Sequence, residues 1–310
     1  MIEPFHEGEV AVQERAGERD LARRHGAGIS SHIIEGALPF LARQRLLAVT
    51  AAGDDGHVWT SVWCGEPGFA RSADGSQLDI VTAVIEGSPD DPVLARVAAG
   101  RDIGVLAIDL LTRRRLRVAG PIEAVSTNRI RVRVRQSVGN CPKYIHRHEY
   151  TGETSVPPSN GGDRQRGSVL DDERRDFLER ATTAFVGSVH RVGGADASHR
   201  GGAPGFIKTV DATILRVPDY PGNSMFMTLG NFMVDSRASL AVLDFERGQI
   251  VSFSGSASVR FEKDSPAQPT GGTGRYWDLA VREWVQFGLP ALKSWQPIDA
   301  SPYNPAAPQK

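Results

Sequence analysis

The most constraining feature of this 310-residue chain is an internal repeat. The sequence GEPGF at 65–69 returns as GAPGF at 202–206. The segment 105–120 also aligns without a gap to a segment of the second half when Asp109 is placed on Asp244. A repeat with so long a period indicates two copies of one domain rather than a solenoid of short units.

Length and composition agree with two β-rich domains. At about 150 residues per domain, the chain is long enough for about two. Its 33 Gly and 19 Pro suit many short strands and tight turns. Each repeat carries about six predicted strands, enough for a small closed barrel. The predicted fold class is mainly β, with a few short helices and two β-barrels in tandem.

A low-complexity stretch of turn-forming residues divides the two halves. We expect an N-terminal arm and the first barrel over 1–150 and a linker over 151–168. The second barrel is expected over 169–289, followed by a Pro-rich extended tail over 290–310.

Local patterns predict the individual elements. Asp-Gly at 55–56, between two apolar runs, is a strong hairpin signal. Helix boundary signals flank 88–100, and 170–181 is also predicted to be a helix. The segment 275–287 fits either a strand or a helix. Residues 1–38 are expected to form an arm or a short helix on the body. Strands are predicted at 57–65, 78–85, 102–109, 114–126, 183–192, 205–211, 213–219, 238–245 and 249–262, with a short helix at 223–233.

Charge and hydropathy exclude several classes of protein. With 36 Lys+Arg against 37 Asp+Glu, the chain lacks the basic excess of a general nucleic-acid binder. No apolar run approaches the roughly 18–20 residues that span a bilayer, and no secretory signal pattern is visible. We therefore expect no membrane partner and a cytoplasmic location. Two cysteines, Cys64 and Cys141, are too few for a disulfide framework.

Five segments together resemble the pyridoxamine 5′-phosphate oxidase-like family of FMN-binding split β-barrels, in a version with two barrels per chain. The resemblance implies FMN as cofactor and a flavin-dependent oxidoreductase. Such an enzyme passes electrons from NAD(P)H or a separate reductase to a small-molecule substrate. In single-barrel relatives the flavin lies at a dimer interface, so two fused barrels would form a pseudo-dimer; a homodimer of the whole chain stays open. The segments are FHEGEVAVQERAG (5–17), WTSVWCGEPGF (59–69), GNCPKYI (139–145), SHRGGAPGF (198–206) and PDYPGNSMFMTLGN (218–231).

The SHRGG sequence carries the clearest candidate site. The Arg200 guanidinium offers a fork of donors that suits a phosphate, and two glycines let the backbone approach a ligand or turn sharply. The alternative from the residues alone is a tight hairpin with a solvated arginine. The resemblance implies that such positions hold the flavin phosphate and ribityl chain. The candidate cofactor-binding residues are Ser198, His199, Arg200, Gly201, Gly202, Lys208, Asn223, Thr228 and Asn231.

Four arginines alternate along the predicted strand at 128–136. Arg129, Arg131, Arg133 and Arg135 would share one face. With Arg113, Arg114, Arg115 and Arg117 one strand earlier, they would form a local basic surface. This surface could bind an anionic ligand, such as a flavin phosphate, a nicotinamide dinucleotide or an acidic substrate, or it could be a solvated strand face partly paired with carboxylates.

Catalytic residues stay unknown at this stage, since the chain carries no nucleophile elbow, Walker loop or dinucleotide fingerprint. Flavin chemistry does not require one, because the cofactor itself transfers the hydride. His146 and His148 could share a strand face but lack a third ligand, so no metal site is predicted. Because GEPGF lacks a preceding Ser-His-Arg, we expect one flavin per chain. A non-catalytic flavin carrier or sensor, a barrel that binds deazaflavin or haem, and an interaction scaffold remain alternatives.

Overall fold

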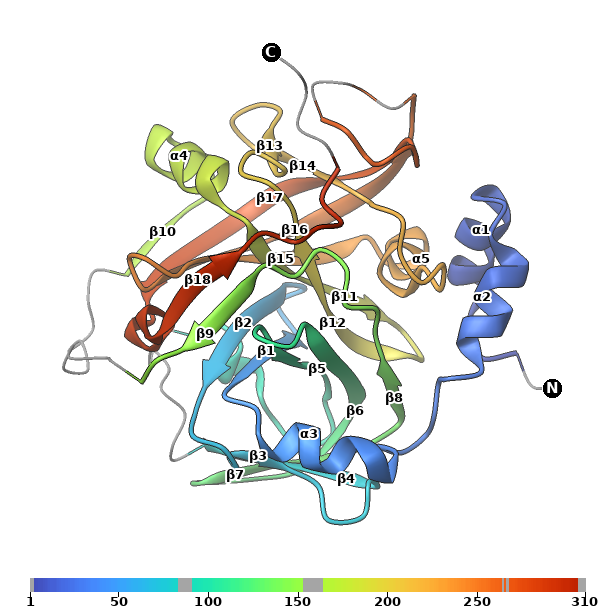
Figure 1. Cartoon of the computed structure of the whole chain (residues 1–310), viewed down its shortest axis with the longest axis vertical. Helices are drawn as coiled ribbons and strands as arrows, with labels where there is room; N and C mark the ends of the chain where they lie inside the picture. Colours follow the sequence, from blue (N-terminus) through green and yellow to red (C-terminus); the bar gives the residue numbers. More distant parts are fainter. Residues whose placement is uncertain (1–2, 83–90, 153–163, 264, 266–267, 306–310) are drawn as a thin grey trace.

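The computed structural model of the chain describes residues 3–82, 91–152, 164–263, 265 and 268–305. Two large antiparallel sheets dominate it, one from each half (Figure 1). The first contains β1 (Leu46–Ala52), β2 (Val58–Cys64), β3 (Ala70–Arg71), β4 (Gln77–Val81), β5 (Asp102–Asp109), β6 (Arg114–Ser126), β7 (Arg129–Arg133) and β8 (Gln136–Gly139). The second contains β10 (Gln165–Gly167), β11 (Thr183–His190), β12 (Gly194–Gly201), β13 (Lys208–Thr209), β14 (Ile214–Pro218), β15 (Arg237–Asp244), β16 (Gln249–Phe261) and β17 (Arg275–Gly288).

The two sheets repeat one strand order. The first runs β2-β1-β5-β6-β7-β4-β3 and the second runs β12-β11-β15-β16-β17-β14-β13. The registers agree as well, because Asp109 pairs with Arg114 and Asp244 pairs with Gln249 at the same end of equivalent hairpins. Both aspartates accept hydrogen bonds from backbone N–H groups of the turn, which explains why the repeat keeps them. The fold is mainly β, with two split β-barrels in tandem.

The barrels pack against each other in a reciprocal way. Strand β2 contacts β15 and β16, while the equivalent strand β12 contacts β5 and β6. Polar groups at this junction form hydrogen bonds from one barrel to the other. The hydroxyl groups of Thr60 and Ser239 lie 2.6 Å apart, and Ser252 donates to the carbonyl of Thr60 at 2.7 Å. This near two-fold arrangement places β6 of one barrel beside β12 of the other.

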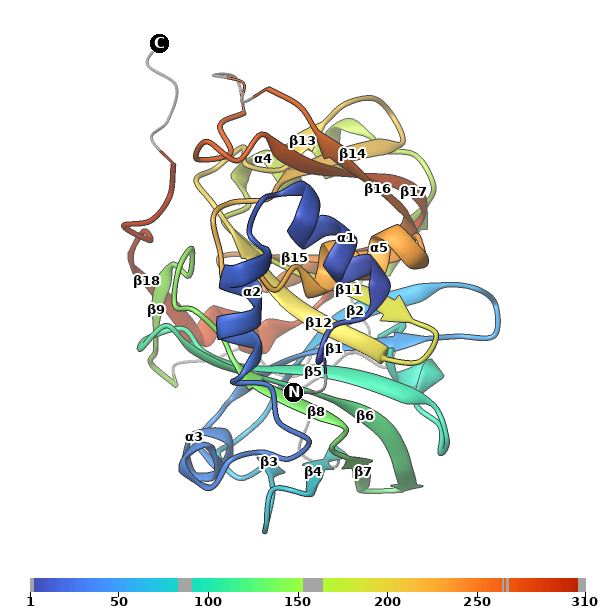
Figure 2. The ribbon, with the colours of Figure 1, turned by 90° about the vertical axis from the view of Figure 1, so that its right-hand side faces the viewer.

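Short helices cover the outside. The N-terminal arm forms α1 (Glu7–Arg15) and α2 (Arg19–Gly26), and α1 packs on α5 (Met227–Val234) of the second barrel (Figure 2). Helix α3 (Leu38–Ala42) lies against β3, and α4 (Asp172–Arg180) contacts β13. Within the described ranges, no helix has the length and apolar character needed to cross a membrane.

The structure decides one open alternative and corrects one predicted helix. The segment 275–287 is a strand rather than a helix, because β17 pairs with β16 from end to end with one register shift at Ser254/Gly255. The segment 88–100 shows only a 3-10 turn, Leu94–Arg96, in its described part, and 88–90 lie outside the described residues.

The predicted linker and tail also hold regular structure. Strand β10 lies within 151–168 and pairs with β17, while 153–163 lie outside the described residues. From residue 290 the chain forms a 3-10 helix, Pro290–Ser294, and strand β18 (Trp295–Asp299), which pairs with β9 (Arg147–Tyr150). Backbone pairing supplies hydrogen bonds that composition does not reveal. The domain limits themselves stay a prediction.

Candidate functional site

A cleft opens where the two barrels meet, between β6 and β12. It holds about 890 Å³ of space, part of it open to solvent. Its walls continue into the loop after β8 and into the segment that leads to α5. The first barrel contributes a polar set to its lining. Arg115 and Arg117 belong to the basic surface noted in the sequence, and Asn140, Cys141, Lys143 and Tyr144 belong to the GNCPKYI segment.

The predicted site residues divide into two groups. The cleft is lined by Ser198, His199, Arg200, Gly201, Asn223 and Thr228. The other three lie outside its lining. Gly202 packs on the ring of Phe206, Lys208 is exposed on β13, and the amide nitrogen of Asn231 donates to the Ser188 hydroxyl at 2.8 Å.

Arg115 and Arg200 give the cleft its positive charge. In both residues Nε is buried and has no hydrogen-bond partner among the described residues. Arg200 Nη1 donates to the Ser198 hydroxyl at 3.2 Å, and Arg115 Nη2 donates to the carbonyl of Cys141. Burial, and then the charge of Arg200, lowers the pKa of Arg115 to about 10. Burial likewise lowers the pKa of Arg200. The cleft thus holds two cationic groups that an anionic ligand would stabilise.

His199, also in the cleft lining, is an unpartnered imidazole among the described residues. Both of its ring nitrogens are buried and have no hydrogen-bond partner in the described part of the chain. Its ring meets Phe185 edge-on, with centroids 5.6 Å apart. Burial, and then the charges of Arg115 and Arg200, holds the pKa of His199 well below its usual value. A neutral imidazole in this position has one donor and one acceptor to offer a ligand.

An ion pair between barrels forms the floor of the cleft. Arg117 of β6 pairs with Asp196 of β12, and both are buried. Arg117 also donates to the amide oxygen of Gln136 at 3.2 Å and to the sulfur of Met227. Burial raises the pKa of Asp196, and the Arg117 guanidinium opposes that shift. The charges of Asp219, which lines the cleft, and of Asp196 partly oppose the lowering of the Arg200 pKa, but neither carboxylate forms an ion pair with Arg200 among the described residues.

Aromatic rings line one wall. The rings of Tyr144 and Tyr220 lie 4.9 Å apart at 42°, and the Tyr144 hydroxyl donates to the carbonyl of Pro221 at 2.9 Å. Burial raises the pKa of Tyr144 to about 12. A Cβ on Gly201 would lie 2.0 Å from the carbonyl oxygen of Tyr144. This glycine therefore admits the backbone of the first barrel, whereas the sequence suggested approach to a ligand or a sharp turn.

The arginine stripe on β7 does not contribute to the cleft. Arg129 and Arg131 pair with Asp79 at 3.7 and 2.8 Å. Arg133 and Arg135 lie 3.4 and 2.8 Å from the carboxylates of Glu123 and Asp102. For these four arginines the alternative of a strand face paired with carboxylates is confirmed, whereas Arg115 and Arg117 of the same predicted basic surface line the cleft.

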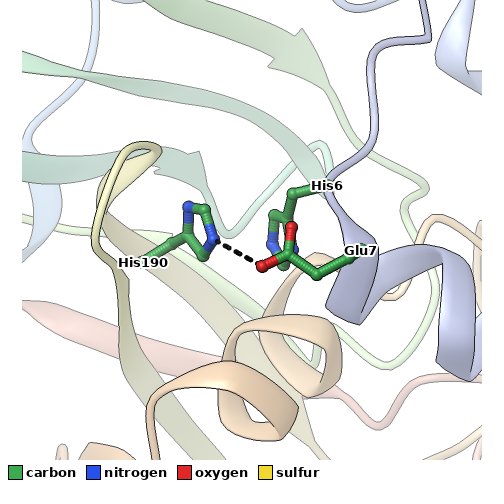
Figure 3. A group of neighbouring side chains, drawn as sticks. All are labelled: His6, Glu7 and His190. Atoms are coloured by element: carbon green, nitrogen blue, oxygen red, sulfur yellow. Dashed lines mark ion pairs between the residues drawn. The ribbon is translucent and has the colours of Figure 1, made fainter.

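A group of possible metal ligands lies at the N-terminus of α1 (Figure 3). The rings of His6 and His190 stack at 4.0 Å, and Glu7 lies 3.9 Å from His190 Nε2. In both rings Nδ1 accepts a backbone N–H, from Gly8 at 3.1 Å and from Gly193 at 2.9 Å. Each neutral ring must then carry its proton on Nε2, the atom a metal would need. The geometry suits the capping of α1 by His6 and a turn contact by His190 rather than metal coordination.

The two histidines considered from the sequence have other contacts. His146 Nε2 accepts from the side chain of Asn304 at 3.0 Å, and His148 stacks on Phe245 with ring centroids 4.3 Å apart.

Comparisons with known proteins give structural neighbours only. No family model and no curated protein matches the chain. Solved split-barrel structures are similar to parts of it. HupZ of Group A Streptococcus is 17% identical over 36% of this chain and 89% of its own, with a TM-score of 0.30. A candidate pyridoxamine 5′-phosphate oxidase from Lactobacillus delbrueckii is 16% identical over 40% and 98%, with a TM-score of 0.31. A candidate 5-nitroimidazole resistance protein from Bacteroides thetaiotaomicron is 11% identical over 42% and 92%, with a TM-score of 0.26.

Proposed function

We propose that this chain binds one flavin mononucleotide (FMN) in the cleft between its barrels and acts as a flavin-dependent oxidoreductase. The observation that carries the proposal is the pair Arg115 and Arg200. Neither guanidinium has a carboxylate within ion-pair distance among the described residues. A phosphate monoester supplies the missing negative charge and accepts hydrogen bonds from planar guanidinium groups with good geometry.

The remaining polar groups of the cleft also fit such a ligand. The unpartnered imidazole of His199 and the hydroxyl groups of Ser198 and Thr228 can bond to a polyhydroxyl chain or to ring nitrogens. The Tyr144–Tyr220 wall provides an aromatic surface for a planar ring. A bound flavin supplies hydride transfer. The chain's own residues bind and orient it and limit the access of water.

Each residue then has a distinct role. Arg115 and Arg200 hold the phosphate, and His199 bonds to the ligand in its neutral form. The Arg117–Asp196 pair fixes the two barrels relative to each other. The electron donor is NAD(P)H or a separate reductase, and the acceptor is a small molecule. No residue is assigned to proton transfer.

A comparison of the two repeats supports one FMN per chain. Superposing the equivalent hairpins β1–β2 and β11–β12 puts Trp63 at the position of Arg200. Superposing β5–β6 on β15–β16 puts Ile250 at the position of Arg115. Both Trp63 and Ile250 are fully buried, and the Trp63 indole donates to Asp91 at 2.9 Å. The counterpart site therefore has no cation at either position.

The proposal is tested by comparing FMN with riboflavin, which lacks the phosphate. We expect FMN to bind more tightly, and Arg200→Ala or Arg115→Ala to weaken FMN binding about 10- to 100-fold while leaving riboflavin binding nearly unchanged. Arg133→Ala, at an exposed arginine that is not part of the cleft lining, is the control. Equal affinity for FMN and riboflavin contradicts the phosphate assignment. If flavin binds but neither NADH nor NADPH reduces it, the alternative function of a non-catalytic flavin carrier or sensor is supported. The absorbance spectrum of the purified protein distinguishes bound flavin from deazaflavin and haem.

A further inference from the structure

Left-handed backbone gathers at the cleft. In the described ranges four non-glycine residues have a positive φ, and three of them line the cleft: Tyr144 at 66°, Ser224 at 62° and Phe226 at 56°. The fourth, Arg113 at 57°, donates to the carbonyl of Ile145 beside Tyr144. Residues with side chains avoid this conformation, so it persists only where surrounding contacts hold it.

The N-terminal arm, residues 5–26, supplies those contacts for Ser224 and its neighbours. Glu18 accepts a hydrogen bond from the Ser224 hydroxyl through Oε2. The amide of Gln13, itself buried, donates to the carbonyl of Met225 at 2.9 Å. His25 Nδ1 donates to the carbonyl of Asn223 at 2.5 Å. The arm thus bonds to three consecutive residues, of which Asn223 and Ser224 line the cleft.

Two further contacts lock the arm in place. The other carboxylate oxygen of Glu18 accepts from Arg275 at 2.8 Å, and Arg275 also bonds Asp219 at 2.9 Å. Helices α1 and α5 cross so closely that a Cβ on Gly230 would lie 2.5 Å from the Cα of Glu9. The arm is therefore held against the second barrel by the Glu18–Arg275 ion pair and by the close packing of α1 on α5.

The C-terminal segment, residues 299–304, holds Tyr144 in a similar way. The buried Ser301 hydroxyl accepts from the backbone N–H of Tyr144 at 3.0 Å. Asp299 accepts from Arg113 at 2.5 Å, and Asn304 donates to His146 at 3.0 Å. Both ends of the chain thus reach the two strained walls of the cleft from outside.

We infer that the two chain ends are clamps that hold the cleft in its ligand-binding shape, with Glu18 and Ser301 as positioning residues. Neither residue lines the cleft. Among the described residues, no strand of the two sheets pairs with the arm, and the arm bonds to the segment 223–225 beside the cleft, to Asn231 on α5 and to Arg275 at the start of β17. The identity of the ligand rests on the proposed function, whereas the clamp itself does not.

The test compares Glu18→Ala with Asp20→Ala. Asp20 lies on the same arm, and its carboxylate is 91% exposed and pairs only with Arg23 within the described chain, at 3.4 Å. The measurements are the Kd for FMN, amide hydrogen exchange of residues 223–228 without ligand, and the Tm without ligand. We expect Glu18→Ala to raise the Kd about tenfold and to speed exchange in this segment, with a near-normal Tm. Asp20→Ala should change none of the three.

A second variant separates positioning from general destabilisation. Glycine adopts left-handed backbone without a steric cost, so Ser224→Gly in the Glu18→Ala background should restore most of the affinity. An unchanged Kd and unchanged exchange in Glu18→Ala overturn the inference, and so does a loss of affinity that Ser224→Gly leaves uncorrected. If the unaltered protein does not bind FMN, the proposed function fails, and exchange in Glu18→Ala alone then decides for or against the clamp.

Discussion

Arg115 and Arg200 come from different barrels, yet they line one cleft, and the charge of Arg200 adds to burial in lowering the pKa of Arg115. Two like charges held together in a partly buried cleft destabilise the ligand-free protein. This arrangement is expected where the missing anion arrives with a ligand. It also means that neither barrel can form the site alone.

The first prediction concerns the destabilisation of the ligand-free protein by these two positive charges. Arg115→Met should raise the ligand-free stability by about 0.5–1 kcal/mol, because it removes a poorly solvated cation and keeps most of the side-chain volume. The same change should weaken FMN binding. Thermal melts with and without FMN measure both effects, and Arg133→Met, on the carboxylate-paired face of β7, is the control. A lower ligand-free Tm for Arg115→Met would show that Arg115 stabilises the ligand-free protein, and that its repulsion with Arg200 is not the dominant effect.

The second prediction concerns the floor of the cleft. Asp196→Ala leaves the Arg117 charge buried without its partner and should cost about 3–5 kcal/mol in the free energy of unfolding. The double variant Arg117→Met/Asp196→Leu removes both charges and should recover most of that loss. Denaturant titration gives the values. A double variant as unstable as the single one shows that the pair is net stabilising.

The third prediction is a pH dependence of stability. Burial lowers the pKa of His148 to about 4. Because the folded ring binds a proton more weakly than the unfolded one, this contribution is full above about pH 6.5 and is lost as the pH falls toward 4, by up to about 3 kcal/mol. Glu9 acts in the opposite sense, since burial raises its pKa to about 7 and its contribution is lost as the pH rises through that value.

His148→Phe isolates the first of these effects. Phenylalanine keeps the stacking on Phe245 but cannot titrate. The fall in Tm between pH 6.5 and pH 4.5 should therefore be smaller in the variant than in the unaltered protein. Equal falls would exclude His148 as a source of the acid sensitivity.

The fourth prediction is the number of ligands. Calorimetric titration should give one FMN per chain, and Arg200→Ala should weaken binding at that single site. If the two barrels carried equivalent sites, Arg200→Ala would instead leave one full-affinity site per chain. A stoichiometry of two contradicts the assignment of Trp63 and Ile250 as replacements for the site arginines.

The fifth prediction concerns metal ions. Because the Nδ1 atoms of His6 and His190 both accept backbone N–H groups, added Zn²⁺ should not raise the Tm at pH 7. A stabilisation by Zn²⁺ that disappears in His190→Ala would show that these rings change tautomer and bind the ion.

Local sequence patterns predicted strands well where apolar residues and turn signals bound them, and strand β12 shows where such patterns fail. Strands β5 and β6 match their predicted ranges because apolar residues and turn signals bound them clearly. Strand β12 was not predicted as a strand, because GADASHRG lacks the branched residues and the alternation of a typical strand. It forms because β11 pairs with it and because β5 and β6 cover it.

The sequence by itself determined the duplication and the second-barrel half of the candidate site around Arg200, whereas the strand order of the two sheets came from the structure. The repeat and the SHRGG motif are local patterns, and local patterns can be read along the chain. Only the tertiary structure decided that Arg115 and Tyr144 complete the cleft. It also showed that Gly201 lacks a side chain where the backbone of Tyr144 packs against it. These contacts depend on how two barrels pack, and packing between distant segments leaves no periodic signal in either of them.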